Sequence, residues 1–131
     1  MKWPWSRRVL TRKELGALGE RHAARALHAK GFRLLDANFR QRSGELDLVA
    51  RDGDTLVIVE VRTRTSTTQM TPLESVNSRK QARLVRTARR YRQQYQLFEC
   101  PCRYDVVEVI ATAQGHVTDV RHFPGAFSSN S

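Results

Sequence analysis

The sequence predicts an α/β fold, in which a mixed β-sheet is flanked by helices in the order αβββαββ. Three observations support it: an alanine-rich helix pattern, β-branched segments around a hairpin turn signal, and an amphipathic helix pattern followed by two further strands. The 131 residues suit one domain, since domains most often have about 100–150 residues. We expect a single domain over residues 11–123, a basic N-terminal segment over 1–10 and a flexible C-terminal tail over 124–131.

The first helix is predicted over residues 12–30. Thr11 and Glu14 have the spacing of a capping box, in which two side chains satisfy free amides of the first helical turn. Gly31 follows the helix pattern at the position where a left-handed residue commonly ends a helix. Small and apolar residues share one side of this helix, and Glu20 lies at the edge of that side.

Three strands are predicted next, over residues 32–39, 45–51 and 55–64. The segment Asp52-Gly53-Asp54 separates the second from the third and is typical of a hairpin turn, because Asp-Gly tolerates positive φ. A polar loop is expected over 65–75.

A second helix is predicted over residues 76–97, followed by strands over 104–112 and 116–123. Two sets of its side chains repeat at helical spacing on roughly opposite faces. The apolar face contains Leu84, Ala88, Tyr91 and Tyr95, and the other contains Arg79, Arg83, Arg86 and Arg90.

The chain has 23 basic and 13 acidic residues, so its formal net charge is +10. This excess favours a polyanionic partner, most simply nucleic acid. The N-terminal segment lacks the apolar stretch of a secretory signal, and no apolar run approaches the roughly 18 residues that span a bilayer, so a cytoplasmic protein without a membrane partner is expected. Cys100 and Cys102 are too few for a disulfide framework and fit a reducing compartment.

The few acidic residues are informative because two of them fall on neighbouring strands of the predicted hairpin. A two-residue turn at Asp52-Gly53 places Asp47 diagonal to Glu60, and a turn at Gly53-Asp54 places the two residues directly opposite each other. Both registers bring the carboxylates to one face of the sheet, where they repel each other, whereas a three-residue loop without a bulge would place them on opposite faces. A hard divalent cation such as Mg²⁺ would resolve this repulsion.

An alternative interpretation is a cross-strand ladder of ion pairs on a solvated sheet face. Its members would be Glu45, Asp47, Glu60, Arg62 and Arg64.

The hairpin carries a specific motif, GELDLV over residues 44–49 followed by VEVRTR over 59–64. In this motif, and in weaker matches over most of the chain, the sequence resembles the YraN-like family of the PD-(D/E)XK nuclease superfamily, near the archaeal Holliday junction resolvases. The resemblance implies a restriction-endonuclease-like fold with its active site on the central hairpin. It implies a metal-dependent endonuclease that hydrolyses phosphodiester bonds in DNA, including branched or structured DNA.

Carried over by position, the resemblance makes Asp47 and Glu60 the ligands of Mg²⁺ or Mn²⁺, and Glu20 a further member of the acidic cluster. The superfamily usually has a catalytic Lys where this sequence has Arg62, and Arg does not give up its proton at working pH. Arg62 keeps the positive charge and is expected to contact the scissile phosphate as a member of the catalytic set. Lys80 is the best candidate to take over the role of the usual Lys, and the alternative for Lys80 is an ordinary lysine at the border of the apolar face of the second helix. The alternative is a non-catalytic nucleic-acid-binding module on the same fold.

Basic side chains near these acids are the expected contacts to phosphates. They are Arg79, Lys80, Arg83, Arg86 and Arg90 on the second helix, with Arg42 and Arg64 on the hairpin strands and turns. A solvated helix face is the alternative for the arginine stripe, and a protein or RNA partner is a third hypothesis for the charge. The resolvase-like relatives imply a homodimer.

Overall fold

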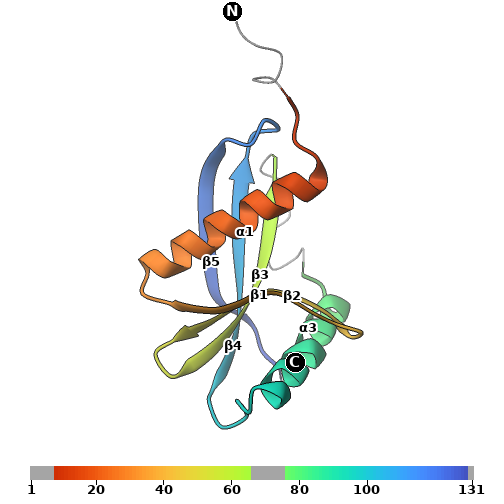
Figure 1. The fold of residues 1–131 in the computed structure, drawn as a ribbon, viewed down its shortest axis with the longest axis vertical. Coiled ribbons are helices and arrows are strands. Elements are labelled where there is room, and N and C mark those ends of the chain that lie inside the picture. The colour runs from red at the N-terminus through yellow and green to blue at the C-terminus, as the bar shows by residue number, and fades with distance from the viewer. Residues whose placement is uncertain (1–7, 66–75, 130–131) are drawn as a thin grey trace, which may run out of the picture.

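The computed structural model describes residues 8–65 and 76–129 (Figure 1). Most of the predicted N-terminal segment and of the 65–75 loop therefore lies outside the described residues. The helices are α1 (Arg12–Ala29) and α3 (Ser78–Gln94), and the strands are β1 (Arg33–Gln41), β2 (Gly44–Asp52), β3 (Thr55–Arg64), β4 (Cys102–Ala111) and β5 (Val117–Phe127).

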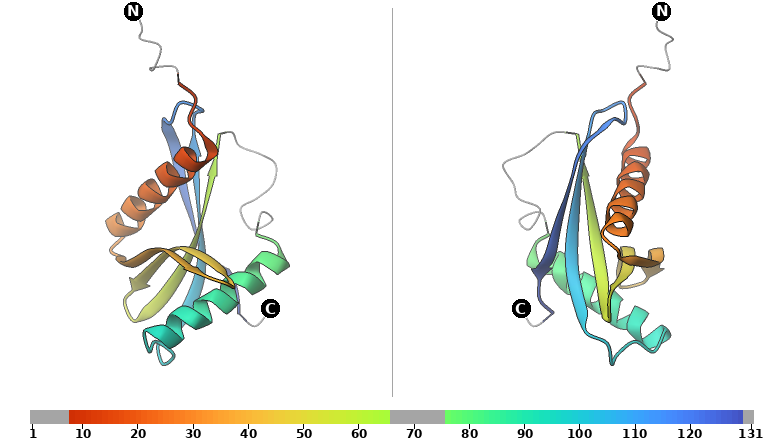
Figure 2. Two further views of the ribbon diagram at one scale, coloured as in Figure 1. Left: turned by 45° about the vertical axis from the view of Figure 1, so that its right-hand side comes forward. Right: turned by 90° about the vertical axis from the view of Figure 1, so that its left-hand side faces the viewer.

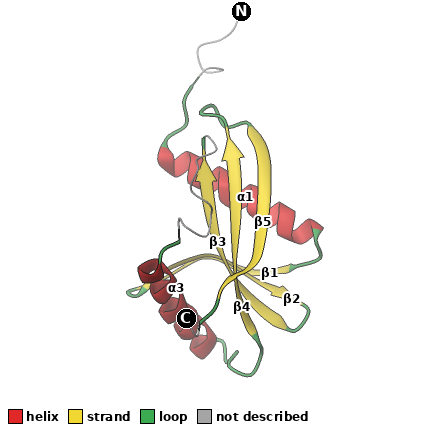
Figure 3. Ribbon diagram, turned by 180° about the vertical axis from the view of Figure 1, so that it is seen from behind, coloured by secondary structure: helices red, strands yellow, loops and turns green. Residues whose placement is uncertain are grey.

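The five strands form one sheet in the order β1-β2-β3-β4-β5. Only β3 and β4 pair in parallel, and the chain between them contains α3. Helices α1 and α3 lie on opposite faces of the sheet (Figure 3). This mixed sheet flanked by helices, in the order αβββαββ, confirms the predicted restriction-endonuclease-like fold class.

The sheet separates two apolar clusters, because successive side chains of a strand point to opposite faces. Under α1, Ala23 and Leu27 pack with Val57, Val59 and Val107, and under α3, Leu84 and Tyr91 pack with Leu56, Ile58 and Val106. The odd-numbered residues of β3 thus face α1 and the even-numbered ones face α3. This alternation directs the side chain of Glu60 toward the α3 face.

Helix α1 begins as predicted. Thr11 Oγ1 accepts a hydrogen bond from the Glu14 backbone N–H at 3.1 Å, and Glu14 Oε1 accepts one from the Thr11 backbone N–H at 2.9 Å. Further along, Gly19 lies so close to β3 that a Cβ atom there would overlap the Thr63 side chain. The missing side chain lets α1 approach the sheet and carries the neighbouring Glu20 close to it.

Helix α3 is shorter than predicted. Asn77 caps its first turn by accepting a hydrogen bond from the Lys80 backbone N–H at 3.0 Å, and the helix ends at Gln94. The predicted extension to residue 97 fails because Gln96 adopts a left-handed conformation with φ of 55°. Tyr95, which we placed on the apolar face, is 47% exposed, although its ring contacts that of Tyr91.

The C-terminal strand is longer than predicted, since β5 continues to Phe127 and residues 124–127 are not part of a loose tail. The physical reason is the fully buried carboxylate of Asp105 on β4. It accepts one hydrogen bond from the Gly125 backbone N–H at 2.9 Å and two from the Arg103 guanidinium. His122 Nε2 lies 2.7 Å from Asp105 Oδ2. These contacts hold the end of β5 against β4 despite Pro124, which disfavours a strand.

The turn between β1 and β2 reaches α3 (Figure 2). The Thr87 hydroxyl of α3 lies 3.0 Å from Ser43 Oγ. Gly44 has a φ of 145°, and a Cβ atom there would crowd the side chain of Arg83. These contacts hold the β1–β2 turn against α3.

No helix in residues 8–65 or 76–129 is both long enough and apolar enough to cross a lipid bilayer.

Gly19→Ala is expected to lower the free energy of unfolding by about 1–3 kcal/mol, because the added methyl group overpacks the contact with Thr63. Gly16→Ala, on the same helix, is the matched control: a Cβ there has no neighbour within 4 Å, and Ala favours a helix by up to about 1 kcal/mol. Denaturant unfolding measures both variants. Equal stability of the two would contradict the close approach of α1 to β3.

Candidate active site

The candidate site lies where β2 and β3 separate. Their pairing runs from Asp52 opposite Thr55 to Leu48 opposite Val59, so the turn is Gly53-Asp54, the second of the two registers considered. The next pair in this register is Asp47 and Glu60. Here the Asp47 side chain takes over from the backbone ladder, since its Oδ2 accepts a hydrogen bond from the Val61 N–H at 2.8 Å.

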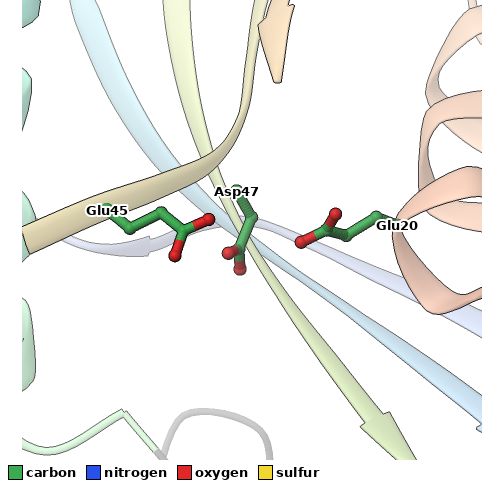
Figure 4. Close-up of side chains that lie close together, drawn as sticks. All are labelled: Glu20, Glu45 and Asp47. Atoms are coloured by element: carbon green, nitrogen blue, oxygen red, sulfur yellow. The ribbon is translucent and has the colours of Figure 1, made fainter. Parts of the chain in front are cut away.

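Three carboxylates from two elements converge at this point. Glu20 of α1 and Glu45 and Asp47 of β2 each place a carboxylate oxygen within 4.8 Å of the others (Figure 4). Glu60 of β3 is 4% exposed, and its carboxylate lies against that of Asp47. The structure thus brings together all three of the predicted acids and adds Glu45.

Glu45 was predicted only as a member of an ion-pair ladder. Its one ion pair within the described residues, to Arg40 at 3.5 Å, leaves it oriented toward Asp47. The signal for its role was its position two residues before Asp47, which places both side chains on one side of the strand. The alternation alone could not show that Glu20 of a distant helix completes the same cluster.

Burial and mutual repulsion disfavour the charges in this cluster. Burial first, and then the negative charge of Glu60, raise the pKa of Asp47 to about 8, against the opposing hydrogen bond from Val61. Burial also raises the pKa of Glu20, to which the charge of Glu45 adds. A divalent cation bound by these carboxylate oxygens would relieve their mutual repulsion, because it favours the charged form of each carboxylate.

Asn38 of β1 is a neighbour of the site that sequence reasoning missed. It is a non-glycine residue with a φ of 55°, a conformation that Asn tolerates better than most residues. With its amide nitrogen toward the acids, it donates hydrogen bonds to Glu45 at 2.9 Å and to Glu20 at 3.2 Å. Nothing in the sequence pattern connects Asn38 with these carboxylates.

A lysine reaches the site from the opposite helix. Lys80 Nζ lies 2.6 Å from Glu60 Oε2, whereas Arg62 Nε, on the same strand as Glu60, lies 3.7 Å from that oxygen. The Lys80 side chain remains 37% exposed, whereas that of Glu60 is buried. The structure therefore places Lys80, and not only Arg62, beside the acidic cluster.

These groups line one open groove between α1 and α3, which we call the acidic groove. Four carboxylates line it, together with cationic side chains and the start of α1. Its lining includes Arg12, Leu15, Gly16, Glu20, Glu45, Asp47, Glu60, Arg62, Arg64 and Lys80.

The remaining predicted basic residues divide into two groups. Arg64 borders the groove, but its side chain is only 15% exposed and pairs at 3.3 Å with Glu108 of β4, a residue outside the predicted ion-pair ladder. Among the members of that ladder, Arg62 pairs with Glu60 at 3.7 Å. The others are exposed on α3 or on the β1–β2 turn, outside the groove. They are Arg79, Arg83, Arg86 and Arg90 on the helix and Arg42 in the turn.

Comparison with known proteins identifies relatives over most of this chain. A family model described as "Uncharacterised protein family UPF0102" matches residues 19–109, which include every acidic residue of the groove. The chain is 44% identical to a UPF0102 protein of Moorella thermoacetica over 119 residues, 91% of this chain and 99% of the relative. It is 45% identical to a UPF0102 protein of Pelotomaculum thermopropionicum over 116 residues, 88% of this chain and 97% of the relative.

The stability of the metal-free protein is expected to depend on pH through Asp47. Because its pKa rises on folding from 3.8 to about 8, the folded state holds a proton that the unfolded chain releases, and stability falls as pH rises through this window. Asp47→Asn removes this titration. We therefore expect the melting temperature of Asp47→Asn minus that of wild type to be larger at pH 8 than at pH 5. Thermal melts with a chelator present measure this difference.

Asp54→Asn, in the exposed hairpin turn, is the control and should change the melting temperature equally at both pH values. A pH-independent effect of Asp47→Asn would contradict the stated electrostatics.

Proposed function

The chain belongs to the UPF0102 family, and from its own side chains we propose that it is a metal-dependent endonuclease that hydrolyses phosphodiester bonds in DNA. The observation that carries this proposal is the convergence of four carboxylates and one lysine where β2 separates from β3. A groove lined by both acids and cations provides the charges that a phosphodiester substrate and its metal ion require.

The donor set fits Mg²⁺ or Mn²⁺, which prefer carboxylate oxygens and are held by few protein ligands together with substrate phosphates. Asp47 and Glu60 would hold the ion, and Glu20 and Glu45 would support them. The bound ion would supply charge stabilisation at the phosphate and activation of water. The unfavourable proximity of these buried carboxylates is the property of the metal-free site that supports this assignment.

Lys80 would supply the positive charge that a nuclease of this class needs beside its acids. Its ammonium group is a compact charge that can donate hydrogen bonds to a phosphate oxygen or to water, and its contact with Glu60 fixes its position. Arg62 would hold a non-bridging phosphate oxygen from the neighbouring strand position. Helix α3 would therefore provide the lysine that the hairpin motif of this chain lacks.

The substrate would be held through its backbone. Arg79, Arg83, Arg86 and Arg90 of α3 and Arg42 of the β1–β2 turn are exposed, and the chain carries a net charge of +10. Contacts of this kind position a nucleic acid without reading its bases, so binding should weaken steeply as salt rises. We propose DNA, including branched or structured forms, as this substrate.

Cleavage of linear, flapped and four-way DNA with Mg²⁺ or Mn²⁺ tests the proposal. Asp47→Asn and Glu60→Gln are expected to abolish cleavage and to weaken Mn²⁺ binding in calorimetric titrations, because each removes a ligand charge. Asp54→Asn is the matched control and should cleave as wild type. Cleavage that survives Asp47→Asn would refute the proposed site.

Lys80→Met is expected to lower the cleavage rate by about 100-fold or more, the cost typical of removing one group that stabilises transition-state charge. Lys13→Met, on the exposed side of α1, is the matched control and should leave the rate unchanged. Single-turnover rates on one DNA substrate measure both. A full rate for Lys80→Met, together with a loss for Arg62→Gln, would transfer the role to Arg62.

The replacement of the usual lysine by Arg62 favours a second candidate, a nucleic-acid-binding module without catalysis. In that case wild type would bind DNA in a salt-dependent manner without cleaving it. Arg62→Lys would then restore cleavage, whereas under the first proposal wild type is active by itself.

A further inference from the structure

A second basic surface lies outside the acidic groove, beside the C-terminal half of α3. We call it the basic hollow. The β1–β2 turn forms one side and α3 the other, and the loop after the helix closes it. It is lined by Arg42, Ser43, Arg86, Arg89, Arg90, Gln93 and Phe98.

The basic hollow concentrates positive charge. Its four arginines are all exposed, and within residues 8–65 and 76–129 none of them forms an ion pair with a carboxylate. The guanidinium groups repel one another, and an anion with several phosphates would relieve this repulsion. Charge alone indicates a polyanion but does not distinguish a duplex from a single strand.

Phe98 makes this distinction. It is a large apolar residue that is 55% exposed, within a surface of arginines. The Arg92 guanidinium lies over its ring at 5.4 Å from the ring centroid. Arg92 also donates hydrogen bonds to the backbone carbonyls of Leu97, Phe98 and Cys100 at 3.1–3.3 Å. The ring is thereby held in place while much of it stays open to solvent.

An aromatic ring that is fixed and exposed among arginines is the arrangement that binds unpaired bases, because the ring stacks on a base while the cations contact the flanking phosphates. A base within a duplex is already stacked and paired, so it does not offer its face. Gln93 of α3 also lines the hollow, and its side-chain amide can form hydrogen bonds with the edge of a base.

We propose that the basic hollow binds a single-stranded stretch of nucleic acid, with one unpaired base stacked on Phe98 and its neighbouring phosphates on Arg86, Arg89 and Arg90. This inference deepens the proposed function and rests on it: the substrate of the acidic groove would be nucleic acid that contains an unpaired segment. Single-strand binding itself does not depend on cleavage.

The two sites border the same structural elements. Arg42 and Ser43 of the hollow precede Glu45 of the groove by two to three residues, and α3 contributes Lys80 to the groove and Arg90 to the hollow. Ten helical residues span about 15 Å. At about 3.4 Å per stacked nucleotide, this corresponds to roughly four nucleotides along one strand. One bound strand can therefore contact both sites.

Fluorescence anisotropy with a labelled 20-nucleotide oligo(dT) and a labelled 20-base-pair duplex tests the proposal, in EDTA and with the full chain. Phe98→Ala is expected to weaken oligo(dT) binding roughly 5- to 150-fold and to leave duplex binding within about twofold. Phe98→Trp keeps an aromatic ring and should retain the affinity. Phe123→Ala, at another exposed phenylalanine on β5, is the matched control and should bind as wild type.

Unchanged oligo(dT) binding by Phe98→Ala would overturn the proposal, and so would an equal loss for oligo(dT) and duplex. A denaturation curve for each variant identifies a folding defect, and the Phe98→Trp variant decides the matter if Phe98→Ala does not fold. EDTA prevents cleavage during the binding measurement, so binding and cleavage are measured separately. Selective single-strand binding in EDTA, combined with no cleavage in the assay with Mg²⁺ or Mn²⁺, would uphold this inference while refuting the endonuclease. Cleavage with unaltered single-strand binding by Phe98→Ala would do the reverse.

Discussion

The hydrogen bond from the Val61 N–H to Asp47 Oδ2 is the interaction on which the candidate site depends. At this position the ladder between β2 and β3 ends, and a backbone donor next to a buried strand would otherwise lack its partner. The Asp47 carboxylate supplies that partner and is thereby held against Glu60, in a setting where burial and repulsion oppose its charge. The strands can then separate without leaving the backbone unsatisfied, and the acidic groove occupies the space between them.

The two helices add charged side chains to those of the hairpin, and they do so from opposite faces of the sheet. Helix α1 approaches β3 closely at Gly19, which carries Glu20 to the acids of β2. Helix α3 brings Lys80 to Glu60, and its contact with the β1–β2 turn holds the strand that carries Glu45 and Asp47. The two sites differ in charge as a result: four acidic residues line the groove together with cations, whereas the basic hollow outside it is lined by arginines and no acidic residue of the described chain.

Local patterns predicted the helices and strands whose formation depends on residues that are neighbours in the chain. The capping box defined the start of α1, and the β-branched run predicted β3 with its observed bounds, Thr55–Arg64. The predictions failed at the ends of two elements. β5 extends to Phe127 because the buried Asp105 binds Gly125 across the strands, a contact between distant residues that leaves no signal in the local sequence. α3 stops at Gln94 because the chain turns at Gln96, a residue type that does not mark a left-handed turn.

The sequence by itself determined the fold class, the basic charge and the fact that Asp47 and Glu60 lie on adjacent strands, because strand periodicity and turn chemistry are local properties. It left open two registers and a three-residue loop between the strands, and the tertiary structure selected the register that places these residues opposite each other. Only the tertiary structure decided that Glu45 and Asn38 join Glu20 and that Lys80 reaches Glu60. These meetings depend on how two helices pack on opposite faces of one sheet, and that packing is set by side chains far apart in the chain.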